Sequence, residues 1–106
     1  MKHRGSQYWF WSDSKLPDES HEESLSNGLT IEVRARLSRK GITQLFIGIY
    51  TATGVPAAEN YFDNRPNETV SQALSWGLTR ARAMATSPTF DGLASLPTPE
   101  TFFLKT

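Results

Sequence analysis

Apolar and polar residues follow a helical period between residues 69 and 86. Apolar side chains recur there at steps of three and four residues, which places them in one stripe on a helix of about 3.6 residues per turn. We therefore expect one long amphipathic helix over 69–86, with this stripe packed on one face of a small sheet. The residues of the stripe are Val70, Ala73, Leu74, Gly77, Leu78, Ala81, Met84 and Ala85.

Local signals mark both ends of this helix. Thr69, followed by Gln72 at the third position after it, fits a capping box, in which side chains and backbone cap each other. Asn67 is an alternative cap. Pro88 ends the period, because the residue before a proline is pushed out of helical geometry.

Three residues of the helix bear on its surroundings. Gly77 in the apolar stripe costs up to about 1 kcal/mol relative to Ala, so the helix backbone is expected to approach the sheet closely there. Trp76 and Arg80 lie one turn apart at the edge of the stripe. The indole has to be covered by the ends of the chain or by a partner, since it would otherwise lie in water.

Strict alternation marks a hairpin. Residues 29–37 alternate between apolar and polar positions, and residues 44–51 return after a tight turn that ends at Gly41. The return strand is apolar on both faces, which predicts a central strand whose outer face is partly covered. Its two faces carry Leu45, Ile47 and Ile49, and Phe46, Gly48 and Tyr50, respectively.

The next segment completes the predicted core. A third strand over 57–62 is weaker, because Glu59 and Asn60 interrupt its apolar residues, and residues 63–66 lead into the helix. Strands followed by a helix indicate an α+β fold. We predict a small antiparallel sheet of three or four strands with one long amphipathic helix packed on one face, and a β-β-β-α core over 29–86.

The two ends of the chain differ from this core. The aromatic residues 8–11 are predicted to form a short edge strand with two rings sealing the core and two at its rim; an aromatic surface for a partner is the alternative. Residues 12–28 are acidic and serine-rich, so 1–28 is predicted to be an aromatic segment plus an acidic mobile loop. Residues 87–106 form a proline-containing apolar tail, expected to fold back, toward Trp76, or to swap between two copies.

Composition favours one soluble domain over 1–106. The 106 residues suffice for a single core, and 11 basic side chains balance 11 acidic ones, which gives no general affinity for nucleic acid. The absence of cysteine excludes disulfides, thiolate metal sites and cysteine nucleophiles. No stretch approaches the roughly 18 apolar residues that span a bilayer, so we expect no membrane partner and a cytoplasmic location.

The sequence contains no recognisable catalytic motif. His3 and His21 lie in the segments expected to be mobile, and no third or fourth ligand with metal-site spacing accompanies them. Glycine-rich phosphate loops and the Gly-x-Ser-x-Gly elbow are also missing. We therefore expect no catalytic residue, no metal and no cofactor, and favour a non-catalytic binding module.

One face of the predicted hairpin combines arginines with aromatic rings. Arg34 and Arg36 point to the same outer face as Phe46 and Tyr50. Such a set suits stacking on single-stranded bases and equally suits a protein interface, while an ordinary solvated face, or one covered by the termini, is the alternative. The candidate binding residues are Arg34, Arg36, Phe46, Tyr50, Trp76 and Arg80.

Two resemblances follow from the helix and the strands before it. The run Asn67-Glu68-Thr69-Val70-Ser71-Gln72-Ala73-Leu74, continuing to Arg82, resembles the helix start of HicB-type antitoxins, whose strand-strand-strand-helix domain binds and blocks an RNA-cleaving toxin. The same order is similar to the carboxy-terminal part of double-stranded-RNA-binding domains. Those domains begin their last helix with a lysine cluster that grips phosphate, whereas Asn67, Glu68 and Thr69 stand here.

Two functions from different classes remain open. The first is a small interaction or regulatory module that binds a protein partner or a second copy of itself through the outer sheet face, with help from Trp76. The second is binding of RNA or single-stranded nucleic acid through the same arginines and rings.

Overall fold

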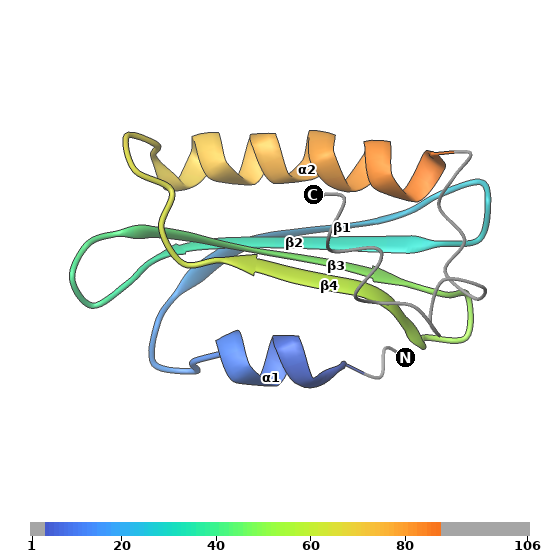
Figure 1. Cartoon of the computed structure of the whole chain (residues 1–106), viewed down its shortest axis with the longest axis horizontal. Coiled ribbons are helices and arrows are strands. Elements are labelled where there is room, and N and C mark those ends of the chain that lie inside the picture. The colour runs from blue at the N-terminus through green and yellow to red at the C-terminus, as the bar shows by residue number, and fades with distance from the viewer. Residues whose placement is uncertain (1–3, 88–106) are drawn as a thin grey trace.

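The computed structural model describes residues 4–87. They form a sheet with one helix on each face (Figure 1). The predicted α+β class, with a small antiparallel sheet and a long helix packed on it, is confirmed. The elements in chain order are α1 (Ser6–Trp11), β1 (Asp18–Ser24), β2 (Thr30–Leu37), β3 (Thr43–Tyr50), β4 (Pro56–Phe62) and α2 (Val70–Thr86).

The sheet is an antiparallel meander of four strands in the order β1-β2-β3-β4. β2 and β3 pair in the predicted hairpin, whose register sets Arg34 opposite Phe46 and Arg36 opposite Gln44. Gly41 has a φ of 79° in the turn between them, a conformation that glycine adopts without steric cost. β3 is central, as its two apolar faces predicted.

α2 begins at the predicted capping box, and its apolar stripe packs on the sheet as predicted. Thr69 accepts from the Gln72 backbone N–H at 3.1 Å, and the Gln72 side chain accepts from the Thr69 N–H at 2.9 Å, which completes the capping box. The stripe packs on one face of β2 and β3, where the buried core contains Ile31, Val33, Ala35, Leu45, Ile47 and Ile49.

Gly77 confirms the close approach of α2 to the sheet. A Cβ atom at this position would lie 2.6 Å from Val33 Cγ1 and 3.0 Å from Leu45 Cδ1. Both distances are shorter than van der Waals contact, so any larger residue would push the helix away from the sheet.

The fourth strand is not the aromatic segment. Residues 8–11 lie in α1, and β1 comes from the stretch predicted to be a mobile loop, so both predictions are wrong. The β1 sequence has no apolar alternation, but pairing with β2 provides hydrogen-bond partners for the β1 backbone. Arg82 of α2 also holds this strand, because its Nη2 lies 2.7 Å from Glu23 Oε1.

α1 is a helix because of what it contacts. Tyr8 and Trp11 are one turn apart and both rings pack against Phe46, with centroid distances of 5.3 and 5.6 Å. Aromatic residues have only modest helix propensity, so this packing on the sheet stabilises the turn. The tail predicted over 87–106 lies, except for Ser87, outside the described residues. Between residues 4 and 87, neither helix has the length and apolarity needed to cross a membrane.

Candidate interaction surface

The outer sheet face is covered by α1. Phe46 and Tyr50 are each 0% exposed, so the structure decides the open question in favour of a face covered by the chain's own amino-terminal segment. The hairpin does bring Arg34, Arg36, Phe46 and Tyr50 to one face, as predicted. Phe46 and Tyr50 are therefore buried beneath α1, while the Arg34 side chain remains 22% exposed.

Arg36 is stacked inside this layer. Its Cζ lies 3.7 Å from the Trp11 ring centroid, and its Nε donates to Gln44 Oε1 at 2.9 Å. Burial lowers the pKa of the Arg36 guanidinium, and the residue is only 7% exposed. This guanidinium therefore has aromatic and amide partners within the chain.

Arg34 belongs to a chain of ion pairs under α1. Its Nε lies 2.8 Å from Glu32 Oε2 and its Nη1 lies 3.2 Å from Asp18 Oδ2. The other oxygen of Glu32 is 2.7 Å from Arg4 Nη1, just before α1. Because Glu32 is almost fully buried, these contacts supply the hydrogen bonds that a buried carboxylate requires.

Glu59 of β4 fixes the start of α1. Its Oε2 accepts from the Gly5 backbone N–H at 2.8 Å and from Tyr50 Oη at 2.9 Å, and its Oε1 accepts from the Tyr8 N–H at 3.2 Å. The carboxylate thus replaces an N-cap side chain, which α1 lacks. Burial, together with Glu59, raises the pKa of the Tyr50 hydroxyl far above its ordinary value.

Trp76 and Arg80 do not join this group. They lie on α2, across the sheet from α1 (Figure 1). The Trp76 ring packs edge-on against Phe62 at 5.5 Å, and Arg65 Cζ lies 3.9 Å from its centroid. The indole is therefore partly covered by β4 and the loop that follows it, and the six predicted residues form two separate groups.

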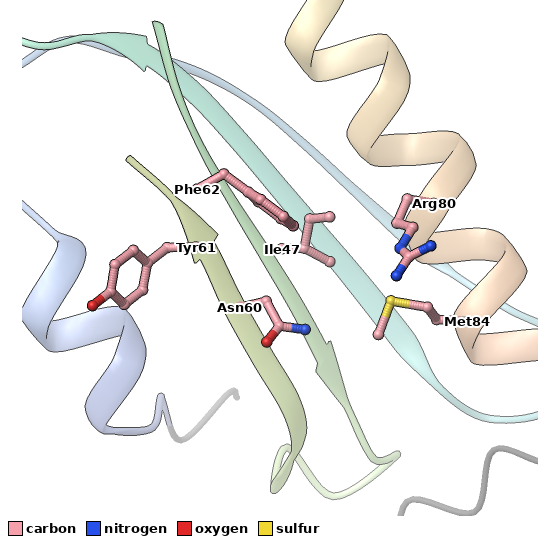
Figure 2. Close-up of a pocket in the computed structure, with 6 residues that line it drawn as sticks. All are labelled: Ile47, Asn60, Tyr61, Phe62, Arg80 and Met84. Carbon is pink, nitrogen blue, oxygen red and sulfur yellow. The ribbon is translucent and has the colours of Figure 1, made fainter. Parts of the chain in front are cut away.

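A shallow groove separates β4 from α2 (Figure 2). Phe62 and Asn60 point across it toward Arg80 and Met84, while Tyr61 points to the opposite side of the sheet, toward α1. Its cavity volume of about 110 Å³ is well below the roughly 300 Å³ at which small-molecule sites begin. Among residues 4–87, Arg80 has no ion-pair partner.

Among the residues that the structure describes, the most exposed aromatic side chains are on α1. Trp9 is 65% and Phe10 75% exposed, and Phe10 stacks on Tyr61 of β4 with 5.6 Å between ring centroids. We call Trp9, Phe10 and Tyr61 the aromatic patch, in which Phe10 contacts Tyr61 and the Trp9 ring packs edge-on against Tyr8 at 5.1 Å. Helical spacing would have shown that Tyr8 and Trp11 share one face and that Trp9 and Phe10 lie opposite, but the contact with Tyr61 depends on the fold.

The two edges of the sheet differ in charge. β1 carries Asp18, Glu19, His21, Glu22 and Glu23, and its side chains are mostly exposed. β4 carries only Glu59 as a charged residue, and that carboxylate is buried under α1. Apart from Glu59, the side chains of β4 are therefore uncharged, with Phe10 against Tyr61 on one face of β4 and the groove, which Arg80 of α2 also lines, on the other.

No group of three His, Cys, Asp or Glu side chains within residues 4–87 could hold a metal ion. No protein-family model, curated protein or solved structure matches this chain. The surface with the clearest chemistry is therefore the β4 side, with its aromatic patch.

Proposed function

We propose that this protein is a non-catalytic interaction module that associates with a second copy of itself through the β4 side of the molecule. The observation that carries the proposal is the pair of large aromatic side chains, Trp9 and Phe10, that remain 65% and 75% exposed. Adjacent exposed rings of this size are unusual on a monomer and typical of contact surfaces, in which aromatic residues supply much of the binding energy.

The charge of the surface favours a protein over a nucleic acid. α1 has no acidic residue in its first turn and no basic residue in its last, and its sequence SQYWFW is uncharged throughout. Binding to phosphates depends on arginine and lysine. Arg34 and Arg36 cannot supply them here, because both are held beneath α1 by Glu32, Asp18, Trp11 and Gln44.

A second copy is the occupant that an uncharged apolar surface accepts most readily. In a two-fold dimer the same patch lies on both sides of the interface, so the patch must be compatible with itself. The aromatic rings meet this condition, because they carry no charge that a second copy would repel.

Light scattering after size exclusion tests the proposal on the full chain over a range of concentrations. We expect the mass of a dimer at high concentration, and the mass of a monomer for the double variant Trp9→Ser/Phe10→Ser. The matched control is Leu37→Ser/Ile42→Ser, which removes two exposed apolar side chains, 49% and 38% exposed, at the β2-β3 turn. The control should remain a dimer.

Circular dichroism of each variant shows whether the fold is retained. A wild-type chain that stays monomeric at every concentration would overturn the proposal. If the Trp9→Ser/Phe10→Ser variant is folded and still a dimer, the assignment of the interface to this surface is overturned.

A further inference from the structure

We infer that two copies join through antiparallel pairing of their β4 strands, so that the two sheets become one continuous sheet. This inference rests on the proposed function and specifies how the second copy binds. It is carried by the edge of β4 and by the groove beside it, which are independent of the exposed rings.

The sheet order provides the first step. With the order β1-β2-β3-β4, only β1 and β4 have one side without a strand neighbour among the described residues. Such an edge presents unpaired backbone N–H and C=O groups that can pair with a strand from another chain.

The charge of each edge provides the second step. Charged side chains along an edge oppose the addition of a strand, and β1 carries them over most of its length. β4 carries Glu59 alone, which points to α1 and accepts hydrogen bonds from Gly5, Tyr8 and Tyr50. β4 itself therefore presents no free charged side chain to a second strand, and the charge beside it is Arg80 of α2, across the groove.

Symmetry connects this edge with the aromatic patch. Antiparallel pairing of two identical strands requires a two-fold axis perpendicular to the sheet, which keeps both copies of α1 on the same face. Phe10 stacks on Tyr61 of β4, so in the dimer these rings from both copies lie beside the junction. Their exposed surfaces then become buried against each other.

The opposite face of the junction has its own apolar surface. The apolar side chains that line the groove between β4 and α2 are Ile47, Phe62 and Met84, and Asn60 and Arg80 line it as polar residues (Figure 2). A strand added to β4 would extend the floor of this groove and bury those side chains further. A stable interface needs roughly 1,000 Å² of buried area, so the rings and the groove would have to contribute besides the strand pair.

Pro56 sets one limit on the pairing. It begins β4 and has no backbone N–H to donate, so the new ladder is expected over residues 57–62. These residues include Ala58 and Asn60, whose β3 partners Ile49 and Ile47 lie in the core under α2. Their side chains are small enough for a neighbouring strand to approach.

Disulfide trapping tests the geometry directly, because the chain contains no cysteine. Single variants Ala57→Cys, Ala58→Cys and Asn60→Cys are oxidised in the full-length protein and examined without reductant. Two thiols bridge only when their Cα atoms lie within about 7 Å. We expect a covalent dimer from one of these positions at least tenfold faster than from Ser20→Cys, the matched position on the β1 edge.

A charge placed on the edge is the second test. Asn60→Lys should raise the dimer dissociation constant at least tenfold, whereas Ser20→Lys on β1 should leave it unchanged. Circular dichroism must show that both variants are folded. For a variant that is not folded, the trapping experiment decides.

The outcomes separate this inference from the proposed function. A dimer that is trapped at β4 and weakened by Asn60→Lys supports both. A dimer that depends on Trp9 and Phe10, yet is neither trapped at β4 nor weakened by Asn60→Lys, overturns the edge pairing and leaves the proposed function standing. A wild-type monomer overturns both.

Discussion

Glu59 lies 54 positions after Gly5 in the chain, and its carboxylate caps α1, the helix that begins directly after Gly5. The Gly5 N–H donates to Glu59 Oε2 at 2.8 Å, and the same oxygen accepts from Tyr50 Oη at 2.9 Å. A single side chain therefore connects α1, β3 and β4. A Cβ atom at Gly5 would lie 2.5 Å from Glu59 Oε1, so this close contact depends on glycine.

The first prediction concerns this cap. Glu59→Gln removes the charge and leaves an amide oxygen that cannot accept all three hydrogen bonds. Because hydrogen bonds to charged groups contribute about 1.5–3 kcal/mol each, we expect the free energy of unfolding to fall by about 1–3 kcal/mol. Exchange of the Tyr8 amide hydrogen should accelerate. Glu19→Gln, on the exposed β1 edge, is the control, and equal exchange rates in the two variants would contradict the assignment.

The second prediction concerns alkaline pH. Burial and Glu59 raise the pKa of Tyr50 in the folded state above the ordinary 10.0, so folding favours the neutral hydroxyl. Its contribution to stability is complete below pH 10.0 and is lost as the pH rises above that value. Denaturation curves on both sides of this pH should show a steeper alkaline loss in the wild type than in Tyr50→Phe. Tyr61→Phe should keep the wild-type slope; if it does not, Tyr50 is not the cause.

The third prediction concerns the contact between α2 and the sheet. Gly77→Ala gains up to about 1 kcal/mol of helix propensity but places a methyl group against Val33, whose branched side chain is stiff, and overpacking costs about 1–3 kcal/mol. We expect a net loss of stability in urea denaturation. In a Val33→Ala background, Gly77→Ala should lower the free energy of unfolding by less than it does in the wild type. Ser75→Ala, on the exposed side of α2, should not destabilise, and a stabilising Gly77→Ala would show that the sheet yields easily.

The fourth prediction concerns the tether of β1. Arg82 forms the hydrogen bonds that lower the pKa of Glu23, and both groups are near the surface. Arg82→Ala should therefore accelerate amide exchange in Asp18–Ser24 with little change in the core, and high salt should reduce the difference because exposed ion pairs are screened. Arg80→Ala, two positions earlier on the same helix, should leave β1 exchange unchanged. If both variants accelerate amide exchange in β1 equally, the Arg82–Glu23 ion pair is not what holds this strand.

Much of the core could be predicted from residues that are close in sequence. The steps of three and four in α2, the Thr69–Gln72 box and the alternation around Gly41 each depend on neighbours within one turn or one hairpin. The candidate site could be predicted only in part. Arg34 and Phe46 do share a face, but whether that face is exposed depends on residues far away in the chain.

The errors have the same physical origin. β1 has no apolar alternation, and its strand conformation is stabilised by backbone pairing with β2 and by Arg82. The sequence predicts a strand over residues 8–11 because aromatic residues favour strands and have only modest helix propensity. Only its packing on Phe46 and its cap from Glu59 select the helix.

The sequence by itself determined the long helix, its start, the central hairpin and the face that each apolar residue occupies, because these follow from short-range geometry. The tertiary structure alone decided that α1 covers the arginine-bearing face, that Trp9 and Phe10 remain exposed, and that β4 forms the uncharged edge. Those features arise where segments distant in sequence meet, and no local period encodes which segments will meet.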